Sequence, residues 1–159
     1  MELMKGKLNN NEKILISYYD AIGIEDQFHI ETESPESFYI NGFTYFSTLD
    51  IGAQGNSAGY EFIVASKDKE ILGLLLFARL NEEQNPCKEC GTLNLFYVDV
   101  REDVRNKGIA KQLFAGWGKY LEEGGNKNEF IQLSSETILG KQAKIHLIAK
   151  KALASHIIS

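Results

Sequence analysis

The pattern of apolar and polar positions changes from strand-like to helix-like at one point of the chain. In residues 96–100, FYVDV, apolar and polar side chains alternate, which predicts a strand. A charged turn follows, and from Ile109 onward the sequence is that of a good helix former, ended by the glycine pair that begins at Gly124. The sequence therefore predicts a strand, a turn and a helix in succession, with a single glycine, Gly108, at the first helical turn.

Three features stand on the N-terminal side of this region. Residues 9–23, NNNEKILISYYDAIG, predict a first helix, with an asparagine cap and apolar residues at helical spacing. The dipeptide Asn41-Gly42 lies between two β-rich runs and predicts a hairpin. Residues 51–59, IGAQGNSAG, predict a flexible loop. The expected order is therefore a helix, a hairpin and a loop.

A run of antiparallel strands is predicted next. Residues 60–66, YEFIVAS, and residues 71–80, ILGLLLFARL, are joined by the turn KDKE and predict an antiparallel pair, with Gly73 as the site of a β-bulge. Residues 81–90, NEEQNPCKEC, predict a polar hairpin tip that leads into the strand at 91–100. This central region therefore predicts a meander of three strands.

The C-terminal third alternates strand and helix. Residues 129–134 predict a strand, residues 138–154 an amphipathic helix, and residues 155–159 the start of one more strand. A strand-helix-strand order implies that the strands at 93–100 and 129–134 lie parallel. The expected fold class is α+β, with a mixed, mostly antiparallel sheet and flanking helices.

Composition limits the classes of function. A chain of 159 residues with 43% hydrophobic and 25% charged residues predicts one globular domain over residues 1–159. A net charge of −5 argues against nucleic-acid binding and is compatible with a cationic small-molecule or peptide partner. We find no signal peptide and no apolar run long enough to cross a membrane. The presence of only two cysteines favours a reducing, cytoplasmic location.

The strand-turn-helix segment has the properties of a phosphate-binding site. The first N–H groups of a helix have no partner within the helix, and the helix dipole favours an anion there. Gly108 has no side chain to block the approach of a ligand. In an acidic protein, residues 101–111 carry four cations against two carboxylates: Arg101, Arg105, Lys107 and Lys111, with Glu102 and Asp103.

Two common phosphate motifs, GxxxxGK[ST] and GxGxxG, are absent. Instead, Arg105-Asn106-Lys107-Gly108-Ile109-Ala110 resembles the (Q/R)-x-x-G-x-(G/A) signature of the GNAT superfamily of N-acetyltransferases. The resemblance extends over residues 58–154 and is specific over 93–125. It implies a GNAT-like acyl-CoA N-acyltransferase fold, shortened at its C-terminus, because relatives usually have two strands after the final helix and only SHIIS follows here.

The resemblance implies that acetyl-CoA binds where the two parallel strands separate. The pantetheine arm would pair with the backbone near Val98 and Val100, and the backbone amides of residues 106–111 would hold the pyrophosphate. An amine would then attack the thioester directly, with the Val98 N–H as oxyanion donor. The cofactor-binding residues implied are Val98, Val100, Arg105, Asn106, Lys107, Gly108, Ile109, Ala110 and Lys111.

The sequence is less informative about the side chains that move protons. Relatives often place a glutamate near position 94, where this chain has Asn94, and a tyrosine in the final helix, near His146. His146 is the candidate acid for the departing thiolate, or a histidine on a mixed helix face. Asp99 is the candidate relay for the amine's proton; alternatively, it pairs with Arg101 or faces water.

The acceptor and the assembly remain open at this point. The acceptor expected from the resemblance is a primary amine of a small molecule, a peptide or a protein. The alternative is a non-catalytic GNAT-like module that binds acyl-CoA or a protein. The final helix favours this alternative, because Gly140 stands where relatives have an asparagine and His146 or Leu147 where they have the tyrosine. If one C-terminal strand is lost, the exposed sheet edge is covered by the early hairpin or by a second subunit, so a homodimer is possible.

Cys87 and Cys90 form a CxxC motif at the predicted hairpin tip. One such pair is too few for a tetrahedral zinc site unless a dimer shares it. A redox motif would open a helix after a strand. Two reduced cysteines in a turn, with no bound metal, is the favoured interpretation.

Overall fold

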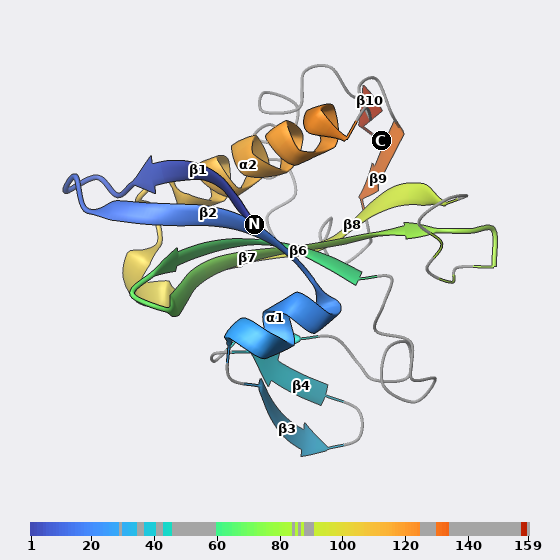
Figure 1. The fold of residues 1–159 in the computed structure, drawn as a ribbon, viewed down its shortest axis with the longest axis horizontal. Helices are drawn as coiled ribbons and strands as arrows, with labels where there is room; N and C mark the ends of the chain where they lie inside the picture. Colours follow the sequence, from blue (N-terminus) through green and yellow to red (C-terminus); the bar gives the residue numbers. More distant parts are fainter. Residues whose placement is uncertain are drawn as a thin grey trace.

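The computed structural model describes residues 1–28, 30–34, 37–40, 43–45, 60–83, 85, 87, 91–124, 130–133 and 157–158. Figure 1 shows how the elements are arranged. In chain order they are β1 (Glu2–Lys7), β2 (Lys13–Asp20), α1 (Ala21–Gln27), β3 (Ile30–Ser34), β4 (Ser37–Ile40), β5 (Phe43–Tyr45), β6 (Tyr60–Lys67), β7 (Glu70–Leu80), β8 (Thr92–Val100), the 3₁₀ turn η2 (Glu102–Val104), α2 (Ile109–Glu123), β9 (Phe130–Leu133) and β10 (Ile157–Ile158).

Most of the described strands belong to one mixed sheet with the order β1-β2-β6-β7-β8-β9-β10. The pairs from β1 to β8 are antiparallel, and β8-β9 and β9-β10 are parallel. Strands β3, β4 and β5 form a separate antiparallel sheet. The predicted α+β class is confirmed, with a mostly antiparallel sheet and a parallel pair, β8 and β9, that precedes and follows α2 in the sequence.

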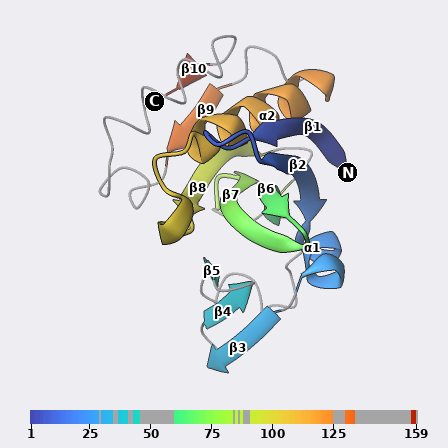
Figure 2. The same ribbon diagram turned by 90° about the vertical axis from the view of Figure 1, so that its left-hand side faces the viewer.

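Strands β6 and β7 form the centre of the main sheet because their apolar side chains are buried on both faces. On one face, α2 packs through Leu113, Phe114 and Trp117, all fully buried. On the other face, α1 contributes Ile24 to a second apolar cluster, and the adjoining Phe28 belongs to it. Figure 2 shows α2 and α1 on opposite sides of the sheet. Within the described part of the chain, no helix is long and apolar enough to span a membrane.

The helix predicted over residues 9–23 is wrong for most of its length. Residues 13–20 form β2, and α1 begins only at Ala21, where the Asp20 carboxylate accepts a hydrogen bond of 2.6 Å from the Gly23 N–H. The apolar residues of β2 contact both faces of the sheet, with Ile14 and Ile16 buried toward α2. A strand covered on both faces loses the alternation that distinguishes it from a helix.

Several other predictions are confirmed. β6 and β7 form the expected hairpin, with the register shift at Leu72, beside Gly73. The pairing of Ile40 with Phe43 leaves two residues for the predicted Asn-Gly turn. β10 confirms a further strand at the C-terminal end. The loop predicted at 51–59 and the helix predicted at 138–154 lie outside the described residues.

The state of the cysteines differs from the prediction. Cys87 is disulfide-bonded, so the expectation of two reduced cysteines is wrong. The chain has one other cysteine, Cys90, which lies outside the described residues. The prediction was based on the low cysteine count, which limits the number of disulfides within the chain to one but does not prevent it. A disulfide sulfur is not a thiolate ligand, and a reducing compartment no longer follows from the cysteine content.

Candidate active site at the end of strand β8

Strand β8 extends beyond its parallel partner. Its residues Leu93–Leu95 pair with β9, whereas β8 itself continues to Val100. Its pairing with β7 shifts register between Leu95 and Tyr97, which leaves Phe96 as the extra residue of a β-bulge. A bulge bends a strand and ends regular pairing. Within the described residues, β8 therefore has an open edge after Leu95.

The backbone of Val100 faces this open edge. The N–H of the following residue, Arg101, donates to the Leu72 carbonyl on β7 at 2.8 Å. Because successive residues of a strand alternate direction, the N–H and C=O of Val100 point away from β7, and so do those of Val98. The contacts of Val100 agree: its N–H donates to Asp99 Oδ1 at 2.9 Å, and its carbonyl accepts from Arg105 Nε at 2.9 Å.

Arg105 and Asp99 lie together at this edge. Arg105 Nη2 is 3.4 Å from Asp99 Oδ1, and both side chains are partly exposed. The alternative that Asp99 pairs with Arg101 is therefore wrong. The structure brings Asp99 next to Val100, and its role in catalysis stays a prediction.

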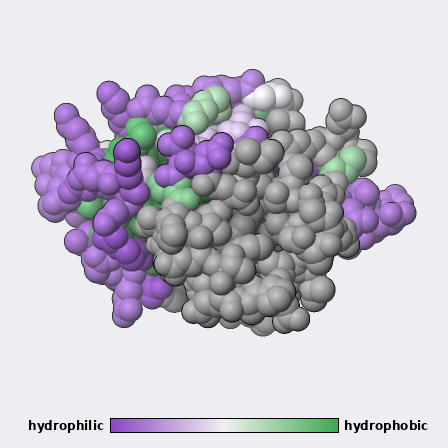
Figure 3. Space-filling view, turned by 60° about the horizontal axis from the view of Figure 1, so that its bottom comes forward, coloured by the Kyte–Doolittle hydropathy of each residue, from purple (hydrophilic) through white to green (hydrophobic). Residues whose placement is uncertain are grey.

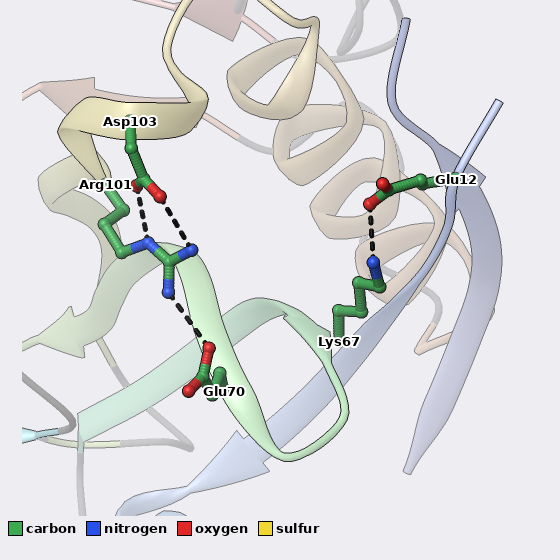
Figure 4. Close-up of polar contacts among 5 residues, drawn as sticks. All are labelled: Glu12, Lys67, Glu70, Arg101 and Asp103. Atoms are coloured by element: carbon green, nitrogen blue, oxygen red, sulfur yellow. Dashed lines mark hydrogen bonds and ion pairs between the residues drawn. The ribbon is translucent and has the colours of Figure 1, made fainter. Parts of the chain in front are cut away.

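Arg101 is instead held by two other carboxylates, as Figure 4 shows. Its Nε and Nη2 bind Asp103 Oδ1 and Oδ2 at 2.6 and 3.0 Å, and its Nη1 lies 3.2 Å from Glu70 Oε2. The hydrogen bonds and charge of Arg101 lower the pKa of the Asp103 carboxyl. Arg101 thus fixes the turn after β8 to the start of β7 and adds little net charge to the site.

The start of α2 has no side-chain cap. Gly108 precedes the first helical residue with φ of 84° and forms no capping bond, and the first turn holds no acidic residue. The first N–H that bonds back within the helix is that of Gln112, which donates to the Gly108 carbonyl at 3.2 Å. The N–H groups of Ile109, Ala110 and Lys111 therefore have no acceptor inside the helix. Gly108 adopts this left-handed backbone conformation without strain because it has no Cβ.

Positive charge remains around this helix start. Among the described residues, neither Lys107 nor Lys111 is in an ion pair. Arg105 contacts Asp99 at the open edge. The uncapped N–H groups and the two lysines together favour an anionic ligand.

Sequence reasoning missed Gln112, Lys7 and Asn9, which contact the loop or its neighbours. Gln112 Nε2 donates to the carbonyls of Lys7 at 2.7 Å and Gly108 at 3.1 Å, and Asn9 Nδ2 donates to the Asn106 carbonyl at 3.3 Å. Contacts between residues this far apart in the sequence leave no local pattern. His146, the candidate acid, lies outside the described residues.

A second cationic surface lies elsewhere on the sheet. A groove of about 780 Å³ on the side of β1 and β2 turned away from α2 is lined by five lysines and one aspartate around apolar side chains: Lys5, Lys7, Lys13, Lys67 and Lys69, with Asp68, Leu15, Tyr19 and Phe28. Figure 3 shows hydrophilic side chains gathered around smaller hydrophobic areas on this side. Lys67 is neutralised by Glu12 at 2.5 Å (Figure 4). The groove is separate from the β8 edge.

Comparison with known proteins agrees with the fold and the signature. Residues 23–150 match the model of the acetyltransferase (GNAT) family, and the chain belongs to this family. The GNAT domain of S. lividans PAT aligns with a TM-score of 0.55 at 12% identity over 93% of this chain and 86% of that one. An aminoglycoside acetyltransferase from an uncultured soil metagenomic sample aligns with a TM-score of 0.54 at 12% identity over 86% and 87%. These likenesses concern the fold alone. A search of curated sequences finds no match.

Proposed function

We propose that this GNAT family member transfers an acetyl group from acetyl-CoA to a primary amine of a small molecule, a peptide or a protein. The observation that carries the proposal is the uncapped start of α2 at Gly108, next to the open edge of β8. A strand edge and a helix N-terminus suit the two parts of coenzyme A, since the pantetheine arm has amides and the pyrophosphate is anionic.

In this proposal the donor is held mostly by backbone. The N–H and C=O groups of Val98 and Val100 pair with the pantetheine arm, and Val100 exchanges its bonds to Asp99 and Arg105 for bonds to the ligand. The amides of residues 106–111 hold the pyrophosphate, and Lys107 and Lys111 supply positive charge. Acetyl-CoA supplies the activated thioester.

The chemical step is a direct transfer. The neutral amine attacks the thioester carbonyl carbon, a C–N bond forms, the C–S bond breaks, and the leaving sulfur takes up a proton and departs as the coenzyme A thiol. The Val98 N–H stabilises the oxyanion that develops. Asp99 receives the amine's proton, and His146 supplies the proton for the thiolate. The departures from the family pattern in the final helix support a second candidate, a module that binds acyl-CoA without turnover.

The test begins with binding. Calorimetric titration with acetyl-CoA, beside dephospho-CoA and ATP, is expected to give one saturable site that Gly108→Trp abolishes. Gly124→Trp is the matched control, because Gly124 is exposed at the other end of the same helix. Absence of acetyl-CoA binding by the unsubstituted protein contradicts the proposal.

Turnover separates the two candidates. Release of coenzyme A thiol is measured with a panel of amines that includes small polyamines, aminoglycosides and peptides with free N-termini or lysines. Acetylated product supports the enzyme. Tight binding of acetyl-CoA without turnover of any amine favours the binding module.

A further inference from the structure

We infer that the N-terminal hairpin of β1 and β2 positions the pyrophosphate-binding loop, and that Gln112 is the residue through which it acts. This inference rests on the proposed function. The hairpin, residues 2–20, precedes the residues that match the family model, 23–150.

Gln112 binds the end of β1 as a neighbouring strand would. Its Oε1 accepts from the Lys7 N–H at 2.9 Å, and its Nε2 donates to the Lys7 carbonyl at 2.7 Å. A Cβ at Gly6 would lie 2.1 Å from Gln112 Oε1, so the glycine makes room for this contact. The carboxamide thereby satisfies both outward-facing backbone groups of Lys7 at the edge of the sheet.

The same carboxamide holds the first carbonyl of α2. Gln112 Nε2 also donates to the Gly108 carbonyl at 3.1 Å. That carbonyl belongs to the same planar peptide unit as the N–H of Ile109, so fixing one fixes the direction of the other. The Ile109 N–H is one of the uncapped donors at the helix start. Gln112 therefore sets the direction of a proposed pyrophosphate donor without touching the ligand.

A second contact repeats this arrangement two residues earlier in the loop. Asn9, at the tip of the hairpin, donates from Nδ2 to the Asn106 carbonyl at 3.3 Å. This carbonyl shares its peptide plane with the N–H of Lys107. Asn106 has φ of 64°, a left-handed conformation that asparagine adopts more readily than most residues other than glycine. The neighbouring Leu8 is buried in the same apolar cluster as Ile109, which anchors the hairpin tip.

Lys119 provides a matched control. Its Nζ donates to the Leu3 carbonyl at 2.6 Å, so it also joins α2 to the outer edge of β1. It lies in the last turns of α2, far along the helix from Gly108. Lys119→Met and Gln112→Leu both remove side-chain bonds between the same two elements. Only Gln112→Leu also removes the side-chain bond to the Gly108 carbonyl, which then keeps the backbone N–H of residue 112 as its donor.

The experiment compares the affinities of these variants for two ligands by calorimetry. The ligands are acetyl-CoA and S-acetylpantetheine, which has the thioester arm and no pyrophosphate. Thermal unfolding, followed through Trp117, the sole tryptophan, checks that each variant is folded. We expect Gln112→Leu to weaken acetyl-CoA binding about tenfold, with little change for S-acetylpantetheine and little effect of Lys119→Met on either ligand.

The outcomes are distinguishable. If Gln112→Leu and Lys119→Met bind acetyl-CoA alike, or if Gln112→Leu loses affinity equally for both ligands, Gln112 does not position the loop. If Gln112→Leu does not fold, Asn9→Ala decides, because a turn asparagine can be shortened without cutting the core; unchanged acetyl-CoA affinity in that variant overturns the inference. Failure of the unsubstituted protein to bind acetyl-CoA removes the proposed function itself, and the inference with it.

Discussion

The rings of Tyr18 and Tyr120 stack with their centroids 4.1 Å apart and their planes at 11°. Both hydroxyls donate to one oxygen, Oε1 of Glu61, at 2.6 and 3.2 Å. Glu61 lies on β6 and is 5% exposed, Tyr18 comes from β2 and Tyr120 from α2. This polar cluster therefore joins α2 to two strands of the sheet beneath an otherwise apolar helix face.

The cluster predicts a loss of stability at alkaline pH. Burial, followed by the hydrogen bond to Glu61, raises the pKa of Tyr18, and burial raises the pKa of Tyr120. Above about pH 10 the unfolded chain loses these phenolic protons while the folded protein keeps them, so the free energy of unfolding falls as pH rises; below that pH the contribution is fully present. Urea unfolding between pH 8 and 11 measures the slope.

The double variant Tyr18→Phe, Tyr120→Phe is expected to flatten this slope. Tyr19→Phe is the control on the same strand, because Tyr19 packs edge-on against Phe28 on the other face of the sheet. An equal slope in the double variant and the unsubstituted protein would show that other groups cause the alkaline loss.

The approach of α2 to β2 predicts that Gly116→Ala destabilises the protein. Alanine normally stabilises a helix interior by about 1 kcal/mol relative to glycine. Here a Cβ at residue 116 would lie 2.5 Å from Ile16 Cγ2, which is fully buried. Overpacking of a core costs about 1–3 kcal/mol. After the helix gain of about 1 kcal/mol is subtracted, we expect a net loss of up to about 2 kcal/mol in urea unfolding.

A double-mutant cycle tests the cause of that loss. Ile16→Ala removes the atom that the new methyl group would meet. The double variant is then expected to be more stable than the sum of the single effects by at least about 1 kcal/mol. Simple additivity would place the strain somewhere other than the contact between residues 16 and 116.

The elements whose sequence pattern is local could be predicted from the sequence alone. β6, β7 and α2 have a clear period or a glycine stop, and the loop between β8 and α2 has a recognisable signature. β2 was assigned to a helix because a strand packed on both faces has apolar residues at nearly every position, which fit either period. What decides its state is the pairing with β1 and β6, and that is non-local.

The candidate site divides in the same way. Residues 105–110 could be identified from their sequence motif alone. The hydrogen-bond partners of Val100 and Gly108 depend on side chains whose orientation no short motif specifies. Arg105 was named from the signature as a cofactor-binding residue, and its contact with the Val100 carbonyl is one that the signature does not specify. The contact from Gln112 to Lys7 spans 105 positions, so only the folded sheet brings the two together.

The groove on β1 and β2 that is lined by five lysines predicts a stabilising substitution. Lys7 and Lys13 are directly opposed on adjacent antiparallel strands, and like charges in such a pair are destabilising. Lys13→Glu is expected to raise the free energy of unfolding by about 0.2–1 kcal/mol at low salt, with a smaller gain at 1 M salt. Lys13→Gln, which removes only the repulsion, should gain less. A loss of stability in Lys13→Glu at low salt would contradict this account of the pair.

The last prediction concerns Asp99, whose carboxylate both holds the edge of β8 and is the proposed acceptor of the amine's proton. Asp99→Asn keeps an oxygen for the Val100 N–H and removes the charge that attracts Arg105. Because the lost charge is negative and near the proposed phosphate site, we expect acetyl-CoA affinity to stay equal or to rise. Turnover with a confirmed amine substrate is expected to fall at least about tenfold, because an amide cannot accept the proton.

The pH profile of turnover distinguishes a proton relay from a structural role. Loss of a proton acceptor removes the limb of the profile that belongs to its ionisation, whereas a change in loop position lowers the rate at every pH. Arg105→Gln is the matched variant, since it breaks the same ion pair from the other side and leaves the carboxylate in place. If Asp99→Asn and Arg105→Gln lose turnover equally and keep the same profile, Asp99 acts only by holding the strand edge.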